Sequence, residues 1–187
     1  MDKLSVVFCT DGIYPLATGG MQKHSRLLIE ELAGDDGLEL TIIHPHKYPV
    51  FNNPDIKEIM VEGIVQKKNY LLECYRYSAR VASALKTLHP DIIYSQGLSV
   101  WADINLFHKK LIINPHGLEP YQAIGLKNKI IAVPFKLLLN YLLNKAAAVI
   151  SLGGKLTMIL SSRIKDKRKI YELPNGVKPS FISDRKK

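Results

Sequence analysis

The chain has 187 residues, a length that allows one sizeable hydrophobic core and is short for two complete domains. With 47% hydrophobic and 23% charged residues its composition is ordinary for a globular protein, and no segment is long and uncharged enough to span a bilayer, which argues against a membrane-spanning protein. The net charge of +9 favours anionic partners, but no zinc finger, helix-turn-helix or aromatic-rich basic motif indicates nucleic acid.

The basic residues gather in four clusters, which are Lys67–Lys68, Lys109–Lys110, Lys165–Lys169 and Arg185–Lys187. An anionic membrane surface or a phosphorylated substrate would complement this charge. Lysines that only keep a surface solvated would produce the same pattern. We therefore expect no nucleic-acid partner, and we leave open a peripheral contact with an anionic membrane.

The N-terminus and the cysteines indicate the cellular compartment. The first apolar run is broken by Thr10-Asp11-Gly12 before it reaches the length of an export signal, and no small-residue cleavage site follows. Cys9 and Cys74 lie far apart and lack metal-ligand spacing. We expect a reduced, cytoplasmic protein, either free or peripheral to the inner face of the membrane.

The first elements are a strand, a glycine-marked loop and a helix. The apolar run 6–8 is typical of a strand, and apolar residues recur at helical spacing from Met21 to Leu32. Gly19 and Gly20 stand where the loop becomes the helix, so backbone amides can approach a ligand at the positive end of the helix dipole. The pair indicates an anion site, although it also permits a plain turn, and it is neither a dinucleotide fingerprint nor a P-loop.

The central part of the chain alternates short apolar runs with helical repeats. In chain order we predict a strand at 38–44, a loop at 47–53, a poorly bounded strand at 59–64, a helix at 71–85 and a strand at 91–95. The face of the helix is marked by Leu71, Tyr75, Ser78, Ala82 and Leu85. The run at 91–95 has no alternation, as expected of a parallel strand buried on both faces.

The C-terminal part continues this alternation. We predict, in order, a short helix at 98–107, a strand at 111–114, a loop with His116 and Glu119, a helix at 130–147, a strand at 148–152, a helix from 153 to about 164, and a strand at 169–173. The helix at 130–147 is apolar on most faces, so we expect it to be mainly core, with membrane contact as the alternative. Pro134 should fix its early turns or kink it.

Strands that alternate with helices call for βαβ units with right-handed crossovers. We therefore predict an α/β, Rossmann-like fold, a three-layer α/β/α sandwich with a mainly parallel sheet of about seven strands. Ligands of such sheets bind beyond the carboxyl ends of the strands. Those ends carry Thr10-Asp11-Gly12, His44, Gln96-Gly97, His116-Gly117, and Ser151 with Gly153-Gly154.

Five short segments occur in the following order along the chain: Gly19-Gly20, IYSQG at 93–97, NPHG at 114–117, AVISL at 148–152 and LPNGV at 173–177. Together they resemble the N-terminal, acceptor-side domain of the family 4 (group 1) retaining glycosyltransferases, which have the GT-B fold. The resemblance covers nearly the whole chain and is weakest at 47–70. It implies a domain at 1–177, the start of an interdomain linker at 178–187, and a C-terminal donor-binding domain that these residues do not include.

The resemblance also implies roles for individual residues. Gly19 and Gly20 would lie beside the donor diphosphate, and His116 would be the catalytic residue that faces the transferred sugar. From their positions in the chain, we expect His24 to point towards the acceptor or a phosphate and Glu119 to bind an acceptor hydroxyl or act as a base, and Gln96 is a weaker candidate for acceptor binding. Apart from the resemblance, a neutral imidazole at a strand end can donate one hydrogen bond to a sugar hydroxyl and accept another. The competing interpretations are that His116 is a structural histidine, that His24 is a surface histidine and that Glu119 is an exposed loop carboxylate.

The implied reaction is transfer of a sugar from a nucleotide-sugar donor to a glycan or lipid-linked acceptor, as in lipopolysaccharide or polysaccharide biosynthesis, without a cofactor. We expect no metal, because His44 and His46 flank a proline and the nearby acids form no Asp-x-Asp pair. The main alternative is a non-catalytic Rossmann-like module that binds a carbohydrate, a nucleotide or a partner chain. A Rossmann oxidoreductase is disfavoured by the missing fingerprint. We expect the chain alone to fold but to transfer no sugar, because it resembles half an enzyme.

Overall fold

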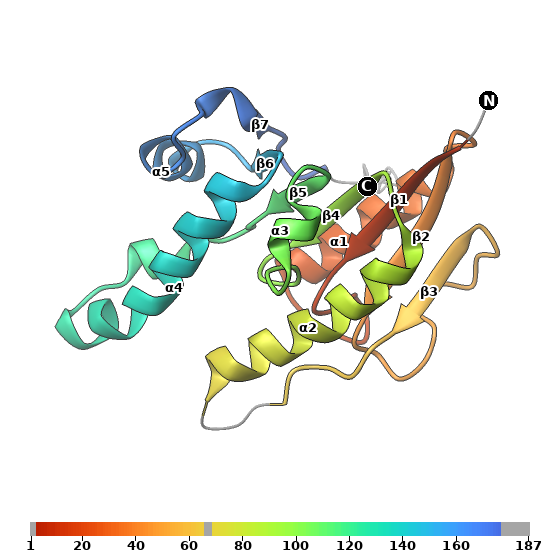
Figure 1. Ribbon diagram of the computed structural model, residues 1–187, viewed down its shortest axis with the longest axis horizontal. Helices are drawn as coiled ribbons and strands as arrows, with labels where there is room; N and C mark the ends of the chain where they lie inside the picture. Colours follow the sequence, from red (N-terminus) through yellow and green to blue (C-terminus); the bar gives the residue numbers. More distant parts are fainter. Residues whose placement is uncertain (1–2, 66–68, 177–187) are drawn as a thin grey trace, which may run out of the picture.

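The computed structural model describes residues 3–65 and 69–176. Several positions discussed above lie outside the described residues, namely Lys67, Lys68, Val177 and the expected linker at 178–187 with its cluster Arg185–Lys187. Within the described ranges, strands and helices alternate along the chain as the sequence predicts (Figure 1).

Seven strands form one sheet in the order β3-β2-β1-β4-β5-β6-β7. The strands are β1 Leu4–Cys9, β2 Leu38–His44, β3 Ile56–Met60, β4 Ile92–Gln96, β5 Leu111–Asn114, β6 Ala148–Ser151 and β7 Ile170–Glu172. Each neighbouring pair is parallel, which confirms the predicted Rossmann-like fold. The strand order reverses between β1 and β4, and this topological switch point is where open parallel sheets bind their ligands.

Helices cover both faces of the sheet. They are α1 Gly20–Leu32, α2 Tyr70–Leu88, α3 Ile104–Phe107, α4 Leu126–Lys145 and α5 Lys155–Arg163, with the 3₁₀ turns η1 Glu119–Gln122 and η2 Lys167–Lys169. Successive side chains of β1 point to opposite faces. Val7 and Cys9 belong to a core shared with α2, α3, α4 and α5, whereas Val6 and Phe8 belong to a core shared with α1. Each face therefore has its own core, which gives the three predicted layers.

The bounds of β3 and the buried face of α2 differ from the prediction. β3 occupies 56–60 rather than 59–64, because its ladder with β2 ends where β2 ends, at His44 opposite Met60. In α2 three of the five predicted face residues, Ser78, Ala82 and Leu85, are buried, whereas Tyr75 is exposed. Cys74 and Tyr77 are buried as well, so the first part of the buried face is displaced from Tyr75 towards Cys74.

Of the helix predicted at 98–107, only the last turn, α3, is helical in the structure. The backbone amides of Trp101 and Ala102 donate to the Ser78 hydroxyl of α2 at 2.7 and 3.0 Å. Asp103, the residue before α3, has a positive φ of 56°. A side chain of another element thus takes the amides that a longer helix would use, and the chain turns before α3 begins.

The prediction that the helix at 130–147 is mainly core is correct only for its C-terminal half. Leu139, Leu142 and Leu143 are buried against the sheet, but Ile130 and Leu137 are largely exposed. Figure 1 shows the N-terminal half of α4 extending beyond the sheet. In the described part of the chain, no helix is long and apolar enough to cross a membrane.

Candidate functional site

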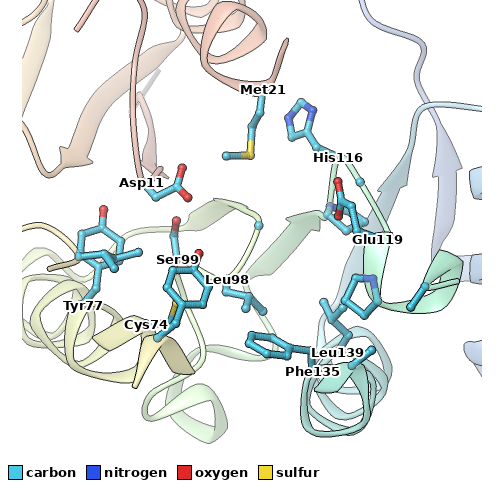
Figure 2. A pocket seen from close by; sticks show the side chains of 18 of the residues that line it. Asp11, Met21, Cys74, Tyr77, Leu98, Ser99, His116, Glu119, Phe135 and Leu139 are labelled. Carbon is cyan, nitrogen blue, oxygen red and sulfur yellow. The ribbon is translucent and has the colours of Figure 1, made fainter. Parts of the chain in front are cut away.

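A cavity of about 640 Å³ opens beyond the carboxyl ends of the strands, beside the switch point between β1 and β4. Asp11 follows β1, Gly20 begins α1 and His116 follows β5, and all three line this cavity. Figure 2 shows Phe135 and Leu139 of α4 at the opposite end from Asp11 and His116. The cavity therefore joins a hydrogen-bonding wall to an apolar wall.

The two glycines lie at the N-terminus of α1. Gly19 precedes the helix with a φ of 152°, and a Cβ on it would overlap the side-chain amide of Gln22. Gly20 lines the cavity, with open space where a Cβ would be. No side chain caps α1. The amides of its first turn, which have no partners inside the helix, can therefore meet an anionic group at this end of the cavity.

His116 is held in an uncommon backbone conformation at the end of β5. Its φ is 53°, in the left-handed region that a residue with a Cβ rarely adopts. Its backbone N–H donates to the Asn114 side-chain oxygen at 3.0 Å, and the Asn114 amide in turn donates to the Tyr94 hydroxyl at 2.9 Å. These bonds hold a turn that places the His116 ring at the cavity and edge-to-face with the His24 ring, with centroids 4.8 Å apart.

The two histidine rings are neutral near pH 7. Burial lowers the pKa of His116 to about 4, with the neighbouring His24 as the second cause, and burial also lowers the pKa of His24. The Nε2 atom of each ring is buried without a hydrogen-bond partner among the described residues. A neutral imidazole with an unused nitrogen can donate a hydrogen bond to a sugar hydroxyl or accept one from it.

Asp11 is a candidate site residue that sequence reasoning did not select. Its side chain projects into the cavity opposite His116 (Figure 2). The Oδ1 atom is buried without a hydrogen-bond partner in the described part of the chain, and burial raises the pKa of the carboxyl group. A carboxylate of this kind can accept hydrogen bonds from hydroxyl groups, and a raised pKa makes it a stronger base. Its place at the strand end nearest the glycine loop was the signal that could have identified it.

The structure brings some of the proposed acceptor residues to the cavity and not others. Glu119 begins η1 and lines the cavity with His116. A Cβ on Gly117 would overlap the Glu119 carboxylate, so the glycine leaves room for that side chain. His24 does not line this cavity; it contacts the His116 ring and lines a second, mostly apolar cavity of about 400 Å³ beside α1.

Gln96 lies behind the cavity rather than in its wall. The residue is fully buried, and its Oε1 accepts hydrogen bonds from the hydroxyls of Ser25 and Thr10. The Tyr77 hydroxyl donates to the Thr10 carbonyl at 2.5 Å. These bonds join β1, β4, α1 and α2 below the site, so the geometry gives Gln96 a supporting position.

Metal ligands do not cluster in the ranges 3–65 and 69–176, where no three His, Cys, Asp or Glu side chains are arranged to hold an ion. His44 instead lies 2.8 Å from Glu58, which also accepts two backbone amides of the 47–53 loop. This network fastens the loop to the end of β2. Cys9 and Cys74 are buried free thiols.

Comparisons with solved structures find the same fold in larger proteins. Sucrose-phosphate synthase from Thermosynechococcus elongatus matches with a TM-score of 0.71 and 16% identity over 92% of this chain and 48% of its own. WaaG, a glycosyltransferase involved in lipopolysaccharide biosynthesis, matches with a TM-score of 0.61 and 15% identity over 93% of this chain and 46% of its own. The UDP-N-acetylglucosamine 2-epimerase from Rickettsia bellii matches with a TM-score of 0.60 and 14% identity over 92% of this chain and 45% of its own. The chain thus spans about half the length of these proteins.

Sequence comparison gives a narrower result than fold comparison. No curated protein sequence matches the chain significantly. The model of Glycosyltransferase Family 4 matches residues 18–181, a segment that includes the glycine loop, both site histidines and all the described strands after β1. Since this match covers most of the chain and agrees with the fold, the chain belongs to glycosyltransferase family 4.

Proposed function

We propose that the chain is the N-terminal, acceptor-side half of a retaining glycosyltransferase, which transfers a sugar from a nucleotide-sugar donor to a glycan or lipid-linked acceptor. The observation that supports this most is the cavity at the switch point, which the N-terminus of α1 and His116 line together inside a family 4 segment. WaaG, which shares the fold, is involved in lipopolysaccharide biosynthesis, and we propose this chain for lipopolysaccharide or polysaccharide synthesis as well.

On the donor side, the amides at Gly19 and Gly20 face the diphosphate. The uncapped N-terminus of α1 carries partial positive charge, and the absence of a side chain at Gly20 allows close approach. Without a second domain, the site at the N-terminus of α1 is open to water. The chain spans about half of the matched glycosyltransferases, so we place the remaining donor contacts on a second domain that follows residue 177 and its linker.

On the acceptor side, His116 touches the transferred sugar, and Asp11 and Glu119 bind acceptor hydroxyls. Neutral imidazole and carboxylate groups together can orient several hydroxyls of a sugar. The apolar wall formed by Phe135 and Leu139 can cover a hydrocarbon part of a lipid-linked acceptor. His24 positions the His116 ring through their edge-to-face contact, and Gln96 supports the strands beneath.

The reaction in this proposal needs neither a metal nor a cofactor. The charge of the leaving diphosphate is met by helix amides and by groups of the second domain. We further propose that the enzyme acts in the reducing cytoplasm, in keeping with two cysteines that remain free thiols.

The proposal is tested by joining the chain to its second domain and measuring release of nucleoside diphosphate from a panel of nucleotide sugars, with and without saccharide and lipid-linked acceptors. We expect release that depends on an acceptor and persists in excess EDTA. Binding of a sugar or nucleotide with no release in any combination would instead indicate the non-catalytic binding module.

A further inference from the structure

The segment between β1 and α1, residues 10–19, brings Asp11 to the cavity and leads into the N-terminus of α1. This β1–α1 segment contains no helix or strand, so contacts with other elements must fix its course. At its start, Thr10 is held by the hydrogen bonds beneath the site described above. Beyond Asp11, the side chain of Ile13 is fully buried, and its backbone N–H donates to the Nε2 atom of His46 at 2.9 Å.

The direction of the bond from Ile13 determines the protonation state of His46. A backbone N–H can only donate, so Nε2 must accept and the ring proton must lie on Nδ1. A protonated ring carries a hydrogen on both nitrogens and would place two donors against each other. Burial lowers the pKa of His46, and the neighbouring His44 lowers it further, whereas Glu58 acts in the opposite direction. The ring is therefore neutral near pH 7, and the bond exists only in that state.

His46 is itself held by polar contacts that reach the edge strand of the sheet. Its backbone N–H donates to the Nδ1 atom of His44 at 3.2 Å, and His44 Nε2 lies 2.8 Å from the Glu58 carboxylate on β3. Since His44 Nδ1 accepts, Nε2 carries the proton and donates to Glu58. The Glu58 side chain is 6% exposed and also accepts the backbone amides of Val50 and Phe51. These bonds hold the loop that carries the His46 ring.

Charged and titratable groups from the other elements also lie near this contact. From α1, the Arg26 guanidinium lies 5.6 Å from the centroid of the Phe51 ring and is paired with a glutamate of its own helix. The β1–α1 segment contributes Asp11, which faces the cavity. Arginine stays charged at all pH values at which proteins are folded, so His44 and His46 are the groups here that can gain a charge in mild acid. Of these two, His46 bonds the β1–α1 segment.

From these contacts we propose that His46 is a positioning residue, whose neutral ring holds the β1–α1 segment so that Asp11 faces the cavity. Thr10 is bound on one side of Asp11 and Ile13 on the other, which leaves the carboxylate little freedom to move away from the wall. Protonation of His46 removes the second bond and loosens the segment. His46 does not line the cavity, so its effect on turnover passes through Asp11 and rests on the acceptor role proposed above.

Amide hydrogen exchange of the 187-residue chain, followed by NMR, tests the contact without any substrate. His46→Ala should lower the protection factor of the Ile13 amide roughly fivefold or more and leave the amides of β1 protected. His46→Gln should keep the protection, because the glutamine Oε1 can accept at the position of Nε2. As the pH falls from 7 to 4, the protection of Ile13 should fall further in the wild type than in His46→Gln, since an amide takes up no proton.

His108→Ala is the matched control, because the His108 ring is also half-buried and hydrogen-bonded but lies at the end of α3. It should leave the exchange of the Ile13 amide unchanged. The proposal is overturned if His46→Ala leaves Ile13 as protected as in the wild type, or if the variant loses protection equally throughout β1. It is also overturned if His46→Gln loses the protection as His46→Ala does.

In the chain joined to its second domain, His46→Ala should lower acceptor-dependent turnover about tenfold, and His46→Gln should restore it to within about twofold of the wild type. The glutamine variant should also keep more of its rate in mild acid than the wild type does. Unchanged turnover in His46→Ala, with an exposed Ile13 amide, would overturn the positioning of Asp11. A wild type that transfers no sugar would count against the proposed function, and the exchange experiment would still decide the contact of His46.

Discussion

At the scale of single residues, the site depends on side chains whose polar atoms the fold leaves unused. His116 combines a strained backbone with a ring nitrogen that has no partner among the described residues. Burying a polar group without a hydrogen bond costs on the order of 1–3 kcal/mol. Such a group persists where a ligand supplies the missing bond, so His116 and Asp11 are better explained by binding than by stability.

We expect His116→Ala, in the chain joined to its second domain, to lower turnover by about 10²-fold or more while changing the melting temperature little. The Nε2 atom of the ring has no hydrogen-bond partner among the described residues, and alanine meets the same backbone strain. Steady-state kinetics and thermal denaturation of the same samples measure both quantities. An unchanged rate with a markedly lower melting temperature would show that His116 is structural.

The lowered pKa of His116 makes stability depend on pH. The unfolded chain binds a proton at this residue below about pH 6.5, and the folded chain does so only below about pH 4. Between these values the unfolded state holds more protons, so the free energy of unfolding falls as the pH falls. The contribution is fully present above pH 6.5, and at most about 3 kcal/mol of it is lost by pH 4.

Urea denaturation of the wild type and of His116→Gln between pH 7 and pH 4 measures this effect. The glutamine cannot take up the proton, so the variant should lose less stability over this range. Parallel curves for the two proteins would contradict the assignment of a buried, neutral His116.

We expect Asp11→Asn to raise the melting temperature by about 2–4 °C, which corresponds to roughly 1 kcal/mol for a chain of this size. Burial raises the pKa of the Asp11 carboxyl group because the charged form is poorly solvated, and a neutral amide avoids that cost. Acceptor-dependent turnover should fall in the same variant, since the amide is a weaker acceptor of hydroxyl protons. A variant that is both less stable and fully active would count against Asp11 as a site residue.

At the scale of elements, the loop after β4 shows how one side chain sets a local structure. The Ser78 hydroxyl of α2 accepts hydrogen bonds from the backbone amides of Trp101 and Ala102. These bonds keep the residues before α3 from forming further helical turns. The loop is thereby held beside the cavity, to which it contributes Gly97, Leu98 and Ser99. A bond between two distant elements thus shapes part of the site.

We expect Ser78→Ala to destabilise the chain by about 2–4 kcal/mol, because two amides at a buried position lose their acceptor. The melting temperature should fall by about 2–4 °C for each kcal/mol. Ser162→Ala is the matched control, since Ser162 lies on the exposed side of α5 and should shift stability by no more than about 0.5 kcal/mol. Equal effects of the two changes would show that the contact of α2 with the loop contributes little.

At the scale of the whole molecule, the described residues form two hydrophobic cores, and we propose that they form one part of the site. Helices α2 to α5 contribute to the core on one face of the sheet, and α1 packs on the other face over β1, β2 and β4. The cavity, by contrast, has polar groups on one wall and opens to solvent. We expect the chain alone to be stable but inactive.

We expect the isolated chain to unfold in one cooperative transition and to bind nucleotide sugars with a dissociation constant no better than roughly millimolar, about −4 kcal/mol. The amides of α1 meet a diphosphate in water, where electrostatic attraction is weak. Isothermal titration calorimetry with several nucleotide sugars measures the affinity. Micromolar binding, or release of nucleoside diphosphate when an acceptor is added, would show that the complete site lies within these 187 residues.

The sequence alone determined the alternation of strands and helices, the parallel sheet and the glycine loop. β2 and β5 lie at the predicted residues, because short buried strands bounded by turn residues leave a local signal in the chain. The family match also agrees with the resemblance read from the ordered motifs. These properties depend on neighbouring residues, which is why they can be read without a structure.

The tertiary structure alone decided which apolar faces are buried and which polar groups meet. α4 has apolar residues on most faces, and only the position of the sheet shows that Leu139 is core while Leu137 is exposed. The edge-to-face contact of His24 with His116, and the shared cavity of Asp11 and His116, join residues from three separate segments. Such contacts depend on strand order and on how far a helix extends past the sheet, and no local pattern in the sequence records either one.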